Sequence, residues 1–239
     1  MDKINSEIVR SEADVLNMLD DLLEKRDSEW WDSFYSDKSK PIPIFTDRPD
    51  ENLVSYIEKG IFKPGKVLDV GCGNGRNSIF LAKSGFQVDA IDFSQKSIDW
   101  ACENARSQSV EVNFYCDSIF NLCTSPHTYD YIFDSGCLHH IKPHRRNQYL
   151  KTIYSMLKPE GHFGLVCFNL KGGANISDYD VYREYSMKGG LAYTEEKLKD
   201  ILEPFFNILE FREMQETVGG EIFGKDFLWA VLARPLQNE

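Results

Sequence analysis

The sequence predicts a single domain with a doubly wound α/β fold, in which a mostly parallel sheet carries helices on both faces. Three observations support this prediction. Short apolar runs alternate with stretches of helical periodicity between residues 66 and 202, the first run leads into a glycine-rich turn, and several runs end in an aspartate. A chain of 239 residues is long enough for one well-buried domain and short for two.

Two features precede the first strand. Residues 8–25 carry apolar side chains at helical spacing, which predicts an amphipathic helix laid on the core or on a partner. Next comes an aromatic segment, residues 30–45, in which Trp30, Trp31, Phe34 and Tyr35 crowd ahead of two prolines. This segment is either a hydrophobic flap that seals the sheet edge or a lid over a positively charged ligand, because aromatic faces attract cations. A helix over 47–59 follows, with Gly60 as its stop.

The glycine-rich turn follows the first strand in the stretch KVLDVGCGNGR, residues 66–76, with glycines at 71, 73 and 75. Glycine tolerates the positive φ of a tight turn and leaves room for a ligand against bare backbone. A dinucleotide fingerprint requires a third glycine at position 76, where this chain has Arg76, so a pyrophosphate site is less well supported. The helix over 76–84 then presents free N–H groups that suit a carboxylate.

Later elements place three more aspartates at strand ends. Asp92 follows the second strand, about 20 residues after Gly71, the interval at which an acidic side chain meets a ribose diol. Asp117 follows the third strand and Asp134 lies on the fourth. We also expect one helix that begins at Ser94, one that begins at His144 and one over 195–202. A fifth strand is expected at 162–168, and strands at 207–214 and 227–235 are expected to form a final antiparallel hairpin.

These residues resemble a known family. The pattern D-x-G-C-G-x-G after Val-Leu, followed by the aspartates at 92, 117 and 134, is similar to the motifs of the class I S-adenosylmethionine (SAM) dependent methyltransferases, closely over 54–168. The aromatic segment resembles the N-terminal segment of the thiopurine and tellurite-resistance methyltransferase groups. The resemblance implies a seven-stranded Rossmann-like sheet of order 3-2-1-4-5-7-6 with the last strand antiparallel. It also implies methyl transfer from SAM to a small-molecule acceptor, with S-adenosylhomocysteine (SAH) as product.

The resemblance also implies a cofactor site. In the family, Asp117 accepts from the adenine amino group, and Phe93 and Ile119 are placed to sandwich the adenine ring. The aromatic segment caps this site, which favours the lid. The expected cofactor-binding residues are Trp31, Asp69, Gly71, Cys72, Gly73, Gly75, Asp92, Phe93, Asp117, Ser118, Ile119, Asp134 and Ser135.

The acceptor side is expected at the end of the fourth strand, DSGCLHHIKP. It lacks the N/D-P-P-Y pattern that binds a flipped base. His139 and His140 are candidate catalytic bases for a hydroxyl or protonated amine, whereas a thiolate, halide or chalcogen oxyanion needs no base. Pro143 is expected to start a helix between these histidines and His144, so we expect no metal site. The candidate substrate residues are Tyr35, Cys137 and three tyrosines of the long loop 169–193, namely Tyr179, Tyr182 and Tyr185.

Composition narrows the remaining classes. A net charge of −11 argues against nucleic acid as a partner. The six cysteines form no C-x-x-C pair, the first thirty residues are charged throughout, and no apolar run approaches a membrane span, so we expect a cytoplasmic protein without membrane contact. The expected domain is 1–239, with 1–46 as N-terminal helix and lid, in a monomer or homodimer. A nicotinamide-dependent oxidoreductase and a non-catalytic SAM-binding protein remain as alternatives.

Overall fold

The computed structural model describes residues 8–23 and 26–237 of the protein. The last two residues of the helix predicted over 8–25 therefore lie outside the described residues, as do both ends of the expected domain. The helices are α1 (Glu12–Leu22), α2 (Ser28–Tyr35), α3 (Glu51–Glu58), α4 (Arg76–Lys83), α5 (Gln95–Ser107), the 3-10 turn η1 (Leu138–His140), α6 (Pro143–Met156), α7 (Asp178–Arg183) and α8 (Glu195–Leu202). The strands are β1 (Lys66–Val70), β2 (Gln87–Asp92), β3 (Asn113–Cys116), β4 (Tyr129–Ser135), β5 (Leu157–Phe168), β6 (Phe206–Glu213) and β7 (Leu228–Pro235).

The seven strands form one sheet in the order β3-β2-β1-β4-β5-β7-β6, which confirms the predicted fold class and strand order. The strands β1 to β5 pair in parallel, and β7 is antiparallel to both β5 and β6. β1 lies between β2 and β4, so the direction of winding reverses beside β1. Open sheets of this kind bind ligands in the crevice at the carboxyl ends of the strands beside such a reversal.

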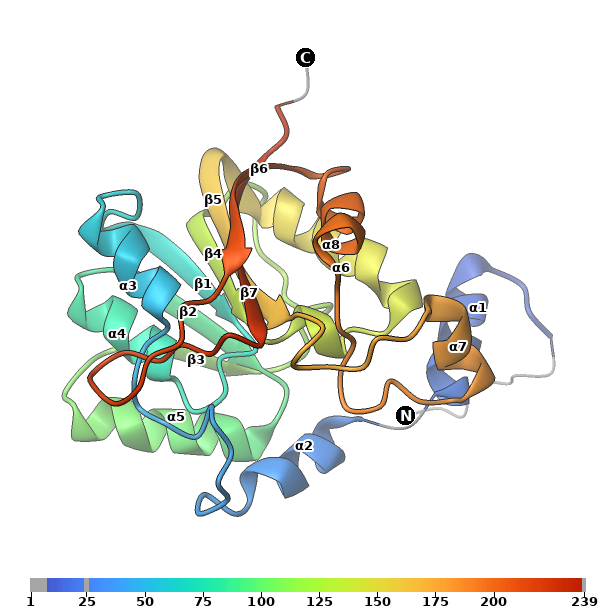
Figure 1. Ribbon diagram of the computed structural model, residues 1–239, viewed down its shortest axis with the longest axis horizontal. Helices are drawn as coiled ribbons and strands as arrows, with labels where there is room; N and C mark the ends of the chain where they lie inside the picture. Colours follow the sequence, from blue (N-terminus) through green and yellow to red (C-terminus); the bar gives the residue numbers. More distant parts are fainter. Residues whose placement is uncertain (1–7, 24–25, 238–239) are drawn as a thin grey trace.

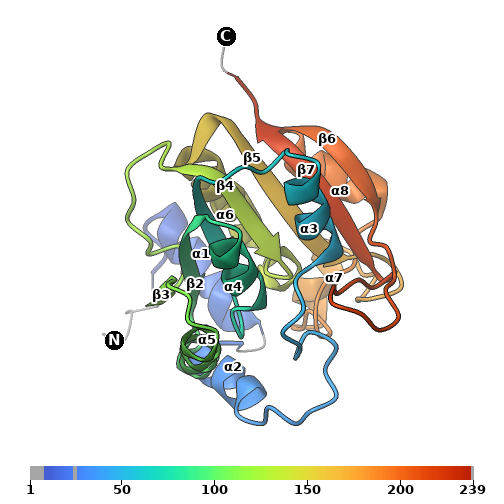
Figure 2. The same ribbon diagram turned by 90° about the vertical axis from the view of Figure 1, so that its left-hand side faces the viewer.

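Helices cover both faces of the sheet. In Figures 1 and 2, α3, α4 and α5 lie on one face, and α6 and α8 lie on the other. Each face has its own hydrophobic core: Leu53, Leu81 and Ile98 belong to the first, and Tyr149 and Leu198 to the second. The central strands are buried on both sides, which explains why β1 reads as an unbroken apolar run rather than an alternating one.

Local signals set several helix boundaries. The hydroxyl of Ser94 accepts from the amide of Ser97 and caps α5, and Thr194 caps α8 in the same way. Pro143 occupies the first turn of α6, as expected, because its fixed φ suits a helix start and its missing N–H is not needed there. β5 begins five residues earlier than predicted, at Leu157, because the chain enters the sheet directly from α6 without a separate turn.

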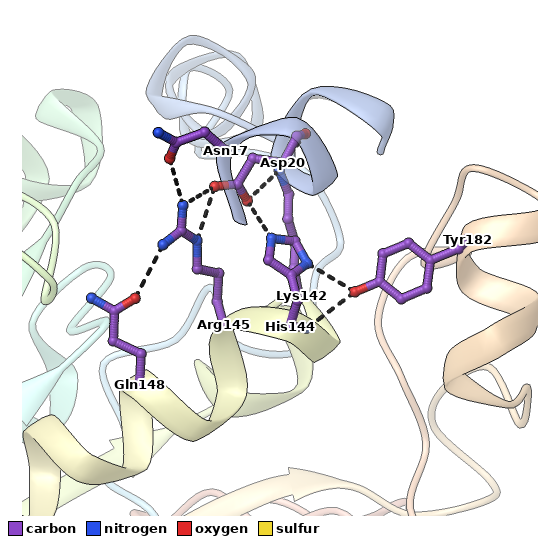
Figure 3. A network of polar contacts seen from close by, with 7 residues as sticks. All are labelled: Asn17, Asp20, Lys142, His144, Arg145, Gln148 and Tyr182. Carbon is purple, nitrogen blue, oxygen red and sulfur yellow. Dashed lines mark hydrogen bonds and ion pairs between the residues drawn. The ribbon is translucent and has the colours of Figure 1, made fainter. Parts of the chain in front are cut away.

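One polar network fastens α1 to the body of the protein (Figure 3). Asp20 lies 2.6 Å from Arg145 Nη2, 3.0 Å from His144 Nε2 and 3.2 Å from Lys142 Nζ. The other ring nitrogen of His144 lies 2.8 Å from the hydroxyl of Tyr182, which extends the network to α7. Burial raises the pKa of Asp20, but the hydrogen bonds from His144 and Arg145 and the charge of Lys142 outweigh it and lower that pKa well below its usual range.

None of the helices within residues 8–23 and 26–237 is long and apolar enough to cross a bilayer.

Candidate active site

A cavity of about 660 Å³ opens at the carboxyl ends of the central strands. The aromatic segment lies across it on one side, and the turns after β1, β2, β3 and β4 line the other. Figure 1 shows α2 running beneath the ends of these strands, next to α5. The volume falls within the range of pockets that bury a drug-sized molecule.

The glycine turn forms one wall of the cavity. Gly71 and Gly73 both have positive φ, +66° and +55°. A side chain at Gly71 would bring Cβ to 3.1 Å from Cys137 Cβ, and one at Gly73 would bring it to 3.0 Å from the Tyr35 hydroxyl. Cys72 also lines the cavity. Gly75 lies apart: it precedes α4 with φ +78°, and a Cβ there would lie 2.9 Å from Ala101, so its small size serves helix packing.

Asp92 lies beside this turn, and each of its carboxylate oxygens accepts a backbone hydrogen bond. Its Oδ2 accepts from the amide of Gly73 and its Oδ1 from the amide of Ser94, each at 3.0 Å. Burial raises the pKa of Asp92, and these two amide bonds oppose the rise by stabilising the carboxylate. Each carboxylate oxygen can accept a second hydrogen bond, and Asp92 lines the cavity, so a vicinal diol can be held there.

The next strand end supplies the neighbouring wall. Asp117, Ser118 and Ile119 follow β3 and line the cavity, as does Phe93, which is 37% exposed. Oδ1 of Asp117 accepts from the amide of Ser118 at 2.7 Å and from the side chain of Asn121 at 2.9 Å. These bonds hold the carboxylate in one orientation. The structure thus brings together the residues that the resemblance assigns to the adenosine.

Two further aspartates differ in position. Asp69 lines the cavity and accepts from Ser78; burial raises its pKa to about 7, opposed by that bond. Asp134 does not line the cavity. It accepts from the amide of Cys137 at 2.6 Å and from the Tyr149 hydroxyl at 2.6 Å, and burial raises its pKa to about 6 against those bonds. It therefore fixes the turn that carries Cys137 and the histidines rather than facing a ligand.

Arg76 is a wall residue that the sequence did not identify as part of the site. It is buried, lies 2.7 Å from Asp50 in an ion pair, and donates to Ser135 Oγ at 3.1 Å. Its guanidinium also lies over the ring of Phe223. Asp50 is held further by the side-chain amide of Asn77 at 2.9 Å. No local sequence pattern predicts the ion pair between Arg76 and Asp50, because the two residues lie far apart in the sequence.

His139 and His140 both line the cavity, but as neutral rings packed into its floor. His139 stacks on Phe168 with centroids 3.8 Å apart, and its Nδ1 accepts from the amide of Phe168 at 3.3 Å. Burial and the neighbouring His140 lower the pKa of His139 well below its usual value. Burial and the charge of Arg26 lower the pKa of His140 to about 3. Our expectation of a titration near neutrality for these rings is corrected by their burial.

The aromatic segment is tied to the site by polar and aromatic contacts. Asp32 Oδ1 accepts from the Ser94 hydroxyl at 2.6 Å and from the amide of Lys96 at 3.0 Å, which joins α2 to the turn after β2. Trp31 meets His140 edge to face, and Tyr35 stacks on Phe45. Trp31 and Tyr35 line the cavity. Burial raises the pKa of Tyr35 well above its usual value, as does the charge of Asp92, so its hydroxyl keeps its proton.

The three loop tyrosines do not line the cavity. Tyr179 is 79% exposed and Tyr185 58% exposed, and the hydroxyl of Tyr182 is bonded to His144 in the α1 network. The loop 169–193 reaches the cavity through the backbone of Gly189 instead, and the amide of Leu191 donates to the His139 carbonyl. The loop folds back through α7, which directs Tyr179 to solvent and Tyr182 to the α1 network.

Several aromatic and aliphatic wall residues were missing from the expected site. They come from the end of β5, from the β6–β7 connection, from the start of β7 and from the aromatic segment: Phe168, Phe223, Phe227, Leu228, Ile42, Ile44 and Trp30. Phe168 is the last residue of β5, so its place at the ligand edge follows from strand direction and was readable. Phe223 and Phe227 lie in the β6–β7 connection, whose path no local pattern shows. Within the described residues, no group of three or more His, Cys, Asp or Glu side chains is placed to hold a metal ion.

Part of the chain is similar in sequence to known proteins. Residues 67–161 match the family model described as "Methyltransferase domain". Over 134 residues the chain is 34% identical to the ubiquinone biosynthesis O-methyltransferase of Coxiella burnetii (strain RSA 493 / Nine Mile phase I), a match that covers 56% of this chain and 54% of that protein. The chain thus spans about half the length of the curated relatives it matches.

Solved structures share the fold. The 1,6-didemethyltoxoflavin-N1-methyltransferase of Burkholderia thailandensis, solved with 1,6-didemethyltoxoflavin and S-adenosylhomocysteine, superposes with a TM-score of 0.68 at 19% identity, over 96% of this chain and 92% of that one. TehB from Haemophilus influenzae gives a TM-score of 0.57 at 21% identity, over 77% of this chain and 61% of that one. Residues 67–161 thus match a methyltransferase domain, which bears out the predicted resemblance to the class I SAM-dependent methyltransferases, a class that uses SAM as its cofactor.

The cavity fits this cofactor by its own chemistry. Asp92 offers two acceptor oxygens for a ribose diol, and the turn at Gly71 and Gly73 leaves no room for side chains between the backbone and the cavity. The aromatic rings of Trp31 and Tyr35 give the opposite wall a surface that attracts a sulfonium.

Proposed function

We propose that this protein transfers the methyl group of SAM to a small-molecule acceptor bound in the same cavity. One observation supports the proposal above all: Asp92, the glycine turn and the segment Asp117–Ile119 line the same cavity. Aromatic side chains line the rest of this cavity, where an acceptor could bind. The neighbours by sequence and by fold include methyltransferases whose names specify small-molecule products or acceptors, which supports the acceptor class.

The cofactor would lie along the wall formed by the ends of β1, β2 and β3. Asp92 would accept from both ribose hydroxyls, and Asp117 from the adenine amino group, with Phe93 and Ile119 against the ring. Trp31, Asp69, Cys72, Ser118 and Ser135 complete the contacts we assign to it. Gly75 and Asp134 support this wall from behind rather than touching the ligand.

When bound, SAM would supply a methyl group on a positively charged sulfur. The thioether that this sulfur becomes is a good leaving group, so the methyl group needs no further activation. The protein's own contribution is then alignment and exclusion of water. The aromatic segment supplies the second of these, and we propose that residues 30–45 act as a lid over the cofactor. The acceptor would enter between this lid and the floor formed by Cys137, His139, His140 and Phe168.

The histidines are positioned as recognition and wall residues. A base with a pKa near 3 is a weak proton acceptor at neutral pH, so His140 contributes little general-base catalysis. A non-catalytic SAM-binding role would leave the acceptor end without purpose, since a sensor has no need of an enclosed apolar space next to the methyl group.

A methyl-transfer screen with isotopically labelled SAM tests the proposal. The acceptors are thiols, halides, selenite or tellurite, amines and phenols. Label should appear in at least one small-molecule product at a rate above that of the protein-free control. Tight SAH binding with no transfer to any class of acceptor would favour the non-catalytic alternative instead.

A further inference from the structure

The acceptor end of the cavity is built from aromatic rings on both sides. On the floor, His139 stacks on Phe168 at 3.8 Å with an interplanar angle of 19°, and Phe227 lies 6.2 Å from Phe168. On the lid side, Trp30 and Trp31 meet edge to face at 4.9 Å. Flat rings facing a space from both sides complement a flat ligand, because aromatic pairs favour stacked and edge-to-face contacts.

Charged side chains at this end are already engaged. Arg76 is paired with Asp50 at 2.7 Å, and Arg26 lies over the Trp30 ring at 4.7 Å and donates to the Gly189 carbonyl at 2.9 Å. The cavity-lining aspartates lie at the cofactor wall. Transferring a charged acceptor into this apolar space would cost several kcal/mol without a matching partner. An oxyanion, a halide or a phosphate ester is therefore a poor fit.

One polar atom in the floor lacks a partner. Nδ1 of His140 is buried and makes no hydrogen bond within the described residues, while the ring lines the cavity and contacts Trp31. Buried polar groups are normally satisfied, and an unsatisfied one in a binding cavity points to a ligand group that completes it. A hydroxyl can serve as donor or acceptor, so it matches either tautomer of the imidazole.

Resting on the proposed methyltransferase function, we infer that the acceptor is an uncharged, planar hydroxyaromatic compound, with its ring against Phe168 and the lid and its hydroxyl bonded to His140 Nδ1. Phe168 and His140 are then specificity-determining residues. This inference excludes thiolates, halides and chalcogen oxyanions from the acceptor classes that the sequence left open.

The test is a calorimetric titration of the intact protein saturated with SAH. The probe 2-naphthol should bind saturably and at least about tenfold more tightly than the saturated analogue decahydro-2-naphthol, which lacks the flat ring. Phosphoethanolamine and tellurite should show no saturable binding. Tighter binding of either charged compound, or equal binding of the flat and saturated alcohols, or no binding of 2-naphthol, overturns the inference.

The hydroxyl contact is tested by a matched pair of ligands and variants. His140→Phe should weaken 2-naphthol by about threefold to thirtyfold and leave naphthalene, which has no hydroxyl, nearly unchanged. Phe168→Leu should weaken both, whereas Phe211→Leu, which changes a ring packed on Trp229 outside the cavity, should weaken neither. Equal losses for naphthol and naphthalene in His140→Phe would overturn the assigned contact.

The same experiment separates this inference from the proposed function. SAH binding to each protein is measured first. A wild-type protein that fails to bind SAH contradicts the methyltransferase function itself, whereas tight SAH binding with the wrong order of acceptor probes contradicts only the acceptor class. Should the His140 variant not fold, the comparison of 2-naphthol with naphthalene on the wild-type protein still decides whether the hydroxyl is recognised.

Discussion

The rings of Trp31 and His140 meet edge to face with their centroids 4.9 Å apart, and this contact joins the aromatic segment to the floor of the cavity. Trp31 comes from α2 and His140 from η1, the turn after β4, so a ligand that bound between the aromatic segment and the floor would meet both elements. Asp32, one residue further along α2, anchors the same helix to Ser94. The segment is therefore bonded to the turn after β2 on one side of the cavity and packs against His140 on the other.

This arrangement predicts that SAH protects the aromatic segment from trypsin. Lys38 lies within it and is 46% exposed, so local opening should allow cleavage after it. Saturation at about 100 times the dissociation constant should slow this cleavage by tenfold or more, because the ligand holds the segment closed. Mass spectrometry identifies the cut. Cleavage after the exposed Lys59, at the end of α3, is the control and should not change. Equal rates at Lys38 with and without SAH would make the segment a permanent flap.

Asp92 gives the sharpest test of the cofactor site. Asp92→Ala would remove the two charge-assisted hydrogen bonds that we propose to the ribose, each worth about 1.5–3 kcal/mol, so calorimetry should show SAM affinity reduced by tenfold or more. Asp99→Ala removes an exposed carboxylate from α5 and is the matched control. Unchanged affinity in the Asp92 variant, or tighter binding of NADH than of SAM by the wild type, would contradict the assignment.

His140 should leave a mark on the pH dependence of stability. Its folded pKa is about 3, lowered by burial and by Arg26, and His139 faces it from the same turn. The unfolded chain binds a proton at His140 below about pH 6.5 while the folded protein does not, so its contribution to stability is complete above pH 6.5 and is lost as pH falls toward 3. The loss attributable to this one group is about 1.4 kcal/mol per pH unit.

Thermal or urea unfolding of wild type and His140→Asn between pH 5 and 8 measures this contribution. Asp69 and Asp134, whose pKa values burial raises to about 7 and about 6, titrate with the opposite sign but occur in both proteins. The difference between the two proteins should therefore be flat above pH 6.5 and change in favour of the variant below it. A difference that is constant down to pH 5 would show that the His140 ring is protonated freely in the folded state.

The sequence was sufficient to predict the fold and to predict which strand ends meet at one wall of the cavity, because both depend on local patterns. Gly71, Gly73 and Asp92 occupy fixed intervals along a strand, turn, helix and strand, and parallel strands bring their ends to one edge. The wall at which we propose that the acceptor binds was harder to predict. The position of Phe227 depends on the path of a long connection, and the outward turn of Tyr179 depends on α7, a helix of six residues whose pattern is too short to read.

The sequence also did not show how deeply His139 and His140 are buried. His139 and His140 look like bases because an unperturbed imidazole titrates near neutrality. The stacking of His139 on Phe168 and the edge-to-face contact of His140 with Trp31 are tertiary features, and this packing keeps both rings uncharged. The role of Arg76 was also hidden in the sequence, where it only occupies the position of the third glycine of a dinucleotide fingerprint. In the structure it forms an ion pair with Asp50 and donates a hydrogen bond to Ser135 Oγ.

The last prediction concerns Asp20, which holds α1 to α6 through Lys142, His144 and Arg145. Asp20→Asn keeps the shape of the side chain and removes its charge. Because the side chain is about one-third exposed (32%), water screens these pairs, and the loss at pH 7 should be about 1 kcal/mol, or roughly 2–4 °C in Tm. Asp21→Asn, an exposed neighbour on the same helix, is the matched control. The folded pKa of Asp20 is lowered, so its contribution is complete above the unfolded value near 4 and disappears as pH falls through the folded value. The gap in Tm between wild type and Asp20→Asn should therefore hold from pH 8 to 5 and shrink below pH 4. Calorimetric scans across this range decide the matter, and a variant that melts with the wild type at pH 7 would show that the network in Figure 3 adds nothing to the docking of α1.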